Sequence, residues 1–227
     1  MPSVYVNPPL RIAVVTFPGS LDDRDLVIAL ERLGAQVKPV WHRDEALPAD
    51  VEGVALPGGF SYGDYLRPGA MARFSPVMSA IRAFADGGGP VLGVCNGFQI
   101  LCEAGLLPGA LVRNSGLRFI CADVELHVAD AGPVGAELTG TLRMPIKHGQ
   151  GAYVADPSRP PIVALRYAGT NPNGSEDAIA GIRNEAGNVF GLMPHPEHAV
   201  DPLLGSSDGA MLLNGFLRTC AARRERS

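Results

Sequence analysis

Apolar positions follow two kinds of pattern in the first half of the chain. Short uninterrupted apolar runs predict buried strands, and apolar residues spaced three and four apart predict amphipathic helices. Strands that alternate with helices in this way predict an α/β fold, with a mostly parallel central sheet flanked by helices. The expected order is strand 11–16, helix 21–33, strand 36–40, strand 53–56, helix 76–85 and strand 91–94.

The first predicted helix begins with acidic residues. Asp22, Asp23 and Asp25 fall in its first turn, where carboxylates interact favourably with the helix dipole. We therefore expect these three side chains on a solvated face.

After residue 107 the pattern changes towards alternation of apolar and polar positions. This pattern predicts an additional antiparallel strand region beside the parallel sheet. We expect one domain over residues 11–227, preceded by an N-terminal extension of residues 1–10, with a final helix starting at Asp208. The alternating or strand-like stretches are residues 111–128, 142–146, 162–167, 179–183 and 189–193.

Composition and charge narrow the class of protein. A chain of 227 residues with 46% hydrophobic content can bury one sizeable core. The net charge of −4 gives no basic footprint, so a nucleic-acid partner is not expected. No apolar run approaches the roughly 18 residues of a membrane span, and the first ten residues do not resemble a signal peptide. The lack of such a run means that no membrane partner is expected. The four cysteines are scattered without metal or disulfide spacing, which favours a reduced, cytoplasmic protein.

The candidate nucleophile is Cys95, which lies between Gly93 and Gly97 where a predicted strand meets a predicted helix. This pattern is typical of a nucleophile elbow, a tight turn in which small residues on either side prevent a clash between strand and helix. The helix dipole favours the thiolate there, and the N–H of Asn96 points where an oxyanion would form. The alternative is a core cysteine beside a chance pair of glycines.

A candidate base follows a second buried strand a hundred residues later. His195 is held between Pro194 and Pro196, and Glu197 comes two residues after it. A thiol nucleophile needs a base, and the base needs a partner that fixes its tautomer. A metal site that includes His198 is the alternative, but helical zinc motifs need a spacing that these prolines prevent. We therefore expect no metal.

The glycine-rich loop at residues 57–64 invites a phosphate-binding interpretation. It lacks the Gly-Lys-Ser/Thr ending of a P-loop and the spacing of a dinucleotide fingerprint, so we reject both. Adjacent glycines allow a main-chain N–H to turn towards a tetrahedral intermediate, which favours a second oxyanion donor. A simple tight turn is the alternative.

These residues in this order resemble the triad, or class I, glutamine amidotransferases, and most nearly the family of glutaminase subunits of phosphoribosylformylglycinamidine synthase. The resemblance runs in order from residue 11 to the final helix. It departs from the family at Leu21 and Asp22, where the family usually has Asn-Cys, and at Gln150, where it usually has Glu. The matching blocks are residues 17–20, 23–25, 56–66, 93–101, 145–149, 171–175, 193–197 and 208–209.

The resemblance implies a flavodoxin-like fold and the hydrolysis of L-glutamine to glutamate and ammonia by Cys95, His195 and Glu197. It assigns the two oxyanion donors to the N–H groups of Gly59 and Asn96. It also implies substrate-binding roles for Gln99, which lies one helical turn after the nucleophile, and for His148 and Gly149. An exposed helix glutamine and a structural histidine are the alternatives for Gln99 and His148.

Partners are implied by the chemistry of ammonia, which would protonate and be lost if released to water. The sequence has no ATP-binding motif, so the reaction that uses ammonia must lie on another chain. The resemblance implies a large ATP-dependent synthetase subunit, with a small third subunit, that converts formylglycinamide ribonucleotide to formylglycinamidine ribonucleotide in de novo purine biosynthesis. ATP and magnesium would then belong to the partner, and this chain would hold no cofactor.

Two other classes of function remain open. One is a different enzyme on the same architecture, either another triad amidotransferase or a cysteine peptidase. The other is a regulatory subunit with a dead site, which would predict a damaged triad, whereas all three members are present.

Overall fold

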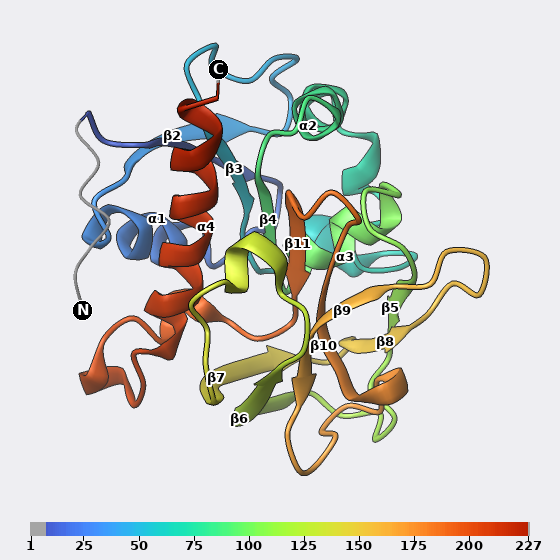
Figure 1. Cartoon of the computed structure of the whole chain (residues 1–227). Coiled ribbons are helices and arrows are strands. Elements are labelled where there is room, and N and C mark those ends of the chain that lie inside the picture. The colour runs from blue at the N-terminus through green and yellow to red at the C-terminus, as the bar shows by residue number, and fades with distance from the viewer. Residues whose placement is uncertain (1–7, 227) are drawn as a thin grey trace.

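The backbone of the molecule is one nine-stranded sheet with helices packed against it (Figure 1). The computed structural model describes residues 8–226. The strands lie across the sheet in the order β2 (Gln36–Trp41), β1 (Arg11–Thr16), β3 (Gly53–Leu56), β4 (Val91–Val94), β11 (Val189–Leu192), β10 (Ile179–Arg183), β9 (Ile162–Tyr167), β6 (Ile120–Val128) and β7 (Thr141–His148).

Neighbouring strands are parallel from β2 to β11. Every residue of β3, β4 and β11 is buried, as expected for strands covered on both faces. Helices α1 and α4 lie on one side of this parallel half, and α2 and α3 lie on the other (Figure 1). The predicted α/β class is confirmed. The helices are α1 (Asp23–Arg32), α2 (Val77–Asp86), α3 (Asn96–Glu103) and α4 (Asp208–Arg224).

From β11 to β7 the strands are antiparallel, which confirms the predicted additional region. Strand β7 alternates buried and more exposed residues along its length. The prediction of one alternating stretch over residues 111–128 was wrong. A loop at 113–119 divides it, and its first part pairs in a separate two-stranded sheet formed by β5 (Ala110–Val112) and β8 (Ala152–Val154).

The buried core runs through both halves of the sheet. It begins at Leu10, whose side chain is 2% exposed. Residues 1–7 lie outside the described residues, so the predicted extension is described only at its end, and the single domain over 11–227 stays a prediction.

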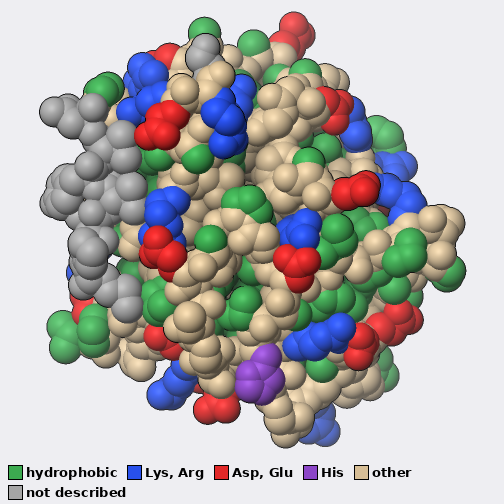
Figure 2. Space-filling model, in the orientation of Figure 1, with side chains coloured by type: hydrophobic (Ala, Val, Ile, Leu, Met, Phe, Trp, Pro, Cys, Tyr) green, Lys and Arg blue, Asp and Glu red, His purple; other side chains and the backbone are tan. Residues whose placement is uncertain are grey.

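Basic and acidic side chains are interspersed on the face seen in Figure 2, without a continuous patch of one sign. Among the described residues, no helix is long and apolar enough to cross a membrane.

Candidate active site

Cys95 occupies the predicted strand-to-helix turn, between the end of β4 and the start of α3. Its backbone has φ 48° and ψ −104°, a strained conformation for a residue with a side chain. A Cβ on Gly93 would come within 2.7 Å of the Gly97 carbonyl carbon, and one on Gly97 within 2.7 Å of the Leu56 carbonyl carbon. Glycine is therefore required on both sides of Cys95, for the steric reason that the sequence indicated.

His195 and Glu197 lie just beyond β11, where Pro196–His198 forms a short 3₁₀ turn. The imidazole Nδ1 is 2.6 Å from Glu197 Oε1, and both residues are buried. Because a carboxylate only accepts, Nδ1 carries the proton and Nε2 is left as the basic nitrogen. Nε2 is buried and has no hydrogen-bond partner within residues 8–226.

The charges around His195 favour its protonated form. Burial alone would lower the pKa of this imidazole, but the negative charges of Glu197 and Cys95, together with the side-chain hydrogen bond to Glu197, raise it above its ordinary value.

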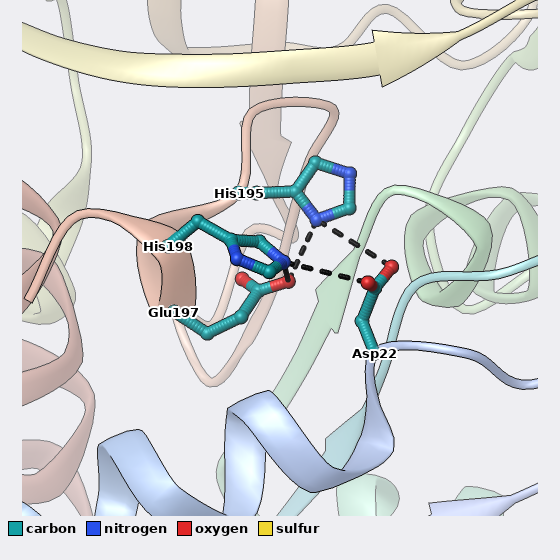
Figure 3. A group of neighbouring side chains, drawn as sticks. All are labelled: Asp22, His195, Glu197 and His198. Atoms are coloured by element: carbon teal, nitrogen blue, oxygen red, sulfur yellow. Dashed lines mark hydrogen bonds and ion pairs between the residues drawn. The ribbon is translucent and has the colours of Figure 1, made fainter. Parts of the chain in front are cut away.

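The structure corrects the prediction for Asp22, which is buried and not on a solvated face. Figure 3 shows its carboxylate turned towards His195 and His198. Oδ2 lies 3.8 Å from His195 Nδ1, and Oδ1 lies 3.4 Å from His198 Nε2 and forms an ion pair with Lys147. Lys147, His195 and His198 lie far along the chain from Asp22, so the local helix-start pattern could not predict these contacts.

Burial would raise the pKa of the Asp22 carboxyl, but the hydrogen bond to His198 and the charges of His195 and Lys147 hold it well below its usual range. Asp22 is therefore ionised. It is a buried anion beside the candidate base.

Residue types that can hold metals do gather here. One ligand atom from each of Asp22, His195, Glu197 and His198 lies within 4.8 Å of the others. Their contacts, however, are with one another and with the Lys147 ammonium, which lies on Asp22 Oδ1 and 3.0 Å from His198 Nε2. A bound cation would have to replace these contacts. The expected absence of a metal stays a prediction.

The two candidate oxyanion donors lie on separate elements. Asn96 is the first residue of α3, so its N–H has no acceptor within the helix. Gly59 forms an antiparallel bridge with Ser20, in which Phe60 donates to Gly19 and the Gly59 N–H faces away from that segment. Its φ is +144°, and a Cβ there would lie 2.5 Å from the Gly19 carbonyl oxygen, so only glycine fits.

Gln99 is buried, and both ends of its side chain are engaged. Its Oε1 accepts from Asn96 Nδ2 at 2.9 Å, and its Nε2 donates to the Gln150 carbonyl at 2.6 Å. Asn96 Oδ1 in turn accepts from the Ser61 N–H at 3.1 Å. Gln99 and Asn96 together therefore tie the helix after the nucleophile to two loops. The bond at Gln150 uses the main chain, so it does not depend on whether residue 150 is Gln or Glu.

His148 ends strand β7 and is buried. Its Nδ1 lies 3.1 Å from Asn114 Oδ1, which also accepts from the Gly151 N–H, so Nδ1 must be the donor. This leaves Nε2 as a buried acceptor without a partner in the described part of the chain. Burial and the nearby His195 lower the pKa of His148 to about 4, so it is neutral.

Asn114 is the residue that the sequence did not indicate. It is fully buried, and its side chain also donates to the carbonyls of Arg118 and His148 at 2.9 Å. Its own N–H donates to the Gly149 carbonyl at 3.0 Å. A lone asparagine in a loop carries no local signal for this role, because its partners come from distant segments.

Known proteins match this chain over most of its length. A family model described as a CobB/CobQ-like glutamine amidotransferase domain matches residues 9–208. The phosphoribosylformylglycinamidine synthase subunit PurQ of Rubrobacter xylanophilus is 54% identical over 217 residues, covering 92% of this chain and 98% of the relative. That of Frankia casuarinae is 53% identical over 223 residues, covering 92% and 95%.

A solved structure matches as well. A chain in the structure of PurLQS from Thermotoga maritima superposes with a TM-score of 0.87 at 46% identity, covering 92% of this chain and 98% of that one. The chain therefore belongs to the family of PurQ subunits of phosphoribosylformylglycinamidine synthase, the glutamine amidotransferase component of that enzyme in purine biosynthesis.

Proposed function

We propose that Cys95, His195 and Glu197 carry out the glutaminase reaction of this subunit. His195 Nε2 takes the thiol proton, and the thiolate attacks the side-chain amide carbon of L-glutamine. The C–N bond then breaks, and His195 Nε2–H protonates the leaving amine to give ammonia. The Nδ1–H group stays hydrogen-bonded to Glu197 throughout. Water hydrolyses the glutamyl thioester to glutamate and frees Cys95.

The oxyanion of each tetrahedral intermediate would be stabilised by the N–H groups of Asn96 and Gly59. Both donors are main-chain groups fixed by steric constraint, which is the preorganisation that this kind of stabilisation needs. Donors of this kind typically contribute roughly 10²–10³ in rate each.

We assign the amino-acid end of glutamine to the segment formed by His148 and Gly149, with Gln99 fixing its position. The bare Nε2 of His148 offers an acceptor to a substrate N–H group. Gln99 supports the segment indirectly, since it holds the Gln150 carbonyl.

We propose that the ammonia passes to a large ATP-dependent synthetase subunit, assembled with a small third subunit, which makes formylglycinamidine ribonucleotide. The support is the likeness to a chain of the Thermotoga PurLQS structure. ATP and magnesium would be bound by the synthetase, and the cytoplasm is the compartment that this reaction implies.

The observation that carries the proposal is the buried contact between His195 and Glu197 at 2.6 Å beside a strained Cys95. Release of glutamate from L-glutamine, measured for the chain alone and with the synthetase subunits, tests it. We expect turnover that rises when the partner is added. Cleavage of a peptide substrate without any glutamine hydrolysis would instead favour a peptidase.

A further inference from the structure

The site contains a carboxylate that the triad does not use. Asp22 precedes helix α1, and its main-chain N–H donates to the Gly58 carbonyl at 3.2 Å, next to the candidate oxyanion donor Gly59. A Cβ on Gly58 would lie 2.5 Å from Asp22 Oδ2 and 2.7 Å from His195 Cε1. Glycine at 58 is thus what allows the carboxylate and the imidazole to pack against the same stretch of backbone.

The two oxygens of Asp22 face different groups. Oδ1 binds Lys147 and lies 3.4 Å from His198, whereas Oδ2 lies 3.8 Å from His195 Nδ1. The separation from His195 is too long for a hydrogen bond, yet short for an interaction between charges in a buried site. Glu197 already holds the proton on Nδ1, so Asp22 acts on the charge of the ring and not on its tautomer.

We propose that Asp22 is a second carboxylate for His195, a positioning residue that acts through the imidazole and stabilises its protonated form while Cys95 carries the negative charge. This inference rests on the proposed function, because it assumes that His195 is the base. Asp22 lies on the Nδ1 side of the ring, whereas the thiol is the partner assigned to Nε2. Its negative charge therefore stabilises the imidazolium more than it destabilises the thiolate.

Lys147 sets the strength of this effect. Its ammonium neutralises part of the Asp22 charge, and its side chain is 33% exposed, so solvent screens it in turn. Removing Asp22 and removing Lys147 should therefore shift the ionisation of His195 in opposite directions. The charged and titratable groups that face His195 or Asp22 are Glu197, Cys95, His148, His198 and Lys147, with Asp25 at 3.9 Å behind His198.

The test is the pH dependence of Cys95 modification by a diazo-ketone analogue of glutamine, followed by mass spectrometry on the full chain with the synthetase subunits. The thiolate forms an S–C bond and displaces N2 only after the diazo carbon is protonated, and the imidazolium supplies that proton, so the rate falls at high pH when the imidazolium loses it. An opposite charge within about 4–6 Å shifts a pKa by roughly one to three units, and Lys147 offsets part of this shift. We therefore expect Asp22→Asn to move the alkaline limb of the pH–rate profile down by about one pH unit.

Two further variants make the outcome decisive. Lys147→Gln should move the same limb upwards, and it keeps the proposal testable if Asp22→Asn does not fold. Asp23→Asn is the matched control, because Asp23 follows Asp22 directly, as the first residue of α1, but makes no ion pair with the described residues of this site, and its profile should match the wild type.

The double variant separates Asp22 from Glu197. In a Glu197→Gln background, Asp22 is the remaining carboxylate near Nδ1, so adding Asp22→Asn should lower the residual rate by a further factor of about ten, the equivalent of one pKa unit. An alkaline limb that stays in place in both Asp22→Asn and Lys147→Gln, with only the overall rate reduced, would show a structural role and overturn this inference. A wild-type chain that is not modified at all would contradict the proposed function instead.

Discussion

The two halves of the sheet supply different residues of the candidate site. The parallel half supplies Cys95 and Gly59 at the carboxyl ends of β4 and β3, and His195 follows β11, the last parallel strand. The positions of Cys95 and Gly59 are fixed by steric constraints on the main chain, and the His195 ring is held by its hydrogen bond to Glu197. The antiparallel half supplies His148, which is held by hydrogen bonds with the Asn114 side chain. The proposed reacting groups thus lie on rigid backbone, whereas the proposed substrate pocket depends on a network of polar side chains.

This division makes a prediction about kinetics. Changes in the parallel half should lower kcat, and changes in the antiparallel half should raise KM and lower stability. The four variants below test the division, beginning with the largest expected effect.

Cys95→Ala should reduce glutamine hydrolysis by about 10⁴-fold or more, as loss of a nucleophile does in other enzymes. Turnover is measured in the assembled complex, with thermal unfolding as the check that the variant is folded. A variant that folds and keeps more than a small fraction of its turnover would remove Cys95 from the mechanism.

Gly59→Ala should lower kcat by about 10²–10³, because a Cβ at φ +144° would collide with the Gly19 carbonyl and turn the donor away. Gly88→Ala is the control, since Gly88 also has a positive φ but a Cβ there would meet none of the described residues within 4 Å. If the two variants lose the same small amount of activity, the Gly59 N–H is not an oxyanion donor.

Asn114→Ala tests the antiparallel half. It leaves buried donors and acceptors unpaired at His148 and Gly151, so we expect the free energy of unfolding to fall by about 1–3 kcal/mol and KM to rise more than kcat falls. Urea unfolding and steady-state kinetics measure the two effects. Asn171→Ala serves as control, because it removes an exposed asparagine of the same half whose side-chain hydrogen bonds, to the Ser175 carbonyl and from the Gly174 N–H, stay within its own loop. A larger loss in kcat than in KM would break the division between the halves.

His148→Gln should change the pH dependence of stability. The folded pKa is about 4 and the unfolded value is near 6.5, so the unfolded chain binds more protons between them and the wild type loses stability as pH falls through this window. The variant lacks this loss. Its stability relative to the wild type should therefore increase by about 1–3 kcal/mol between pH 6.5 and pH 4. His127→Gln, which replaces an exposed histidine, is measured beside it as the control for the substitution itself.

The sequence predicted the parallel half closely because its signals are local. Strands β1, β3 and β4 coincide with their predicted ranges, and the elbow is recognisable from two glycines around one cysteine. The steric reason for those glycines is contained in the same short segment.

Two features could not be predicted, because they depend on residues that meet only in the folded chain. Asp22 is buried and paired with Lys147, which lies 125 residues away, whereas a helix-start pattern alone indicates a solvated carboxylate. Strand β8 has three residues, too few for any periodicity. It pairs with β5, and the Asn114 side chain holds the start of β8 through the Gly151 N–H.

The central claim is that Cys95 is the nucleophile of a glutamine site. Mass spectrometry after exposure to a diazo-ketone analogue of glutamine, with and without the synthetase subunits, tests it most directly. We predict a single adduct on Cys95 that forms faster when the partner is present. Modification at another residue, or none in either condition, would contradict the account.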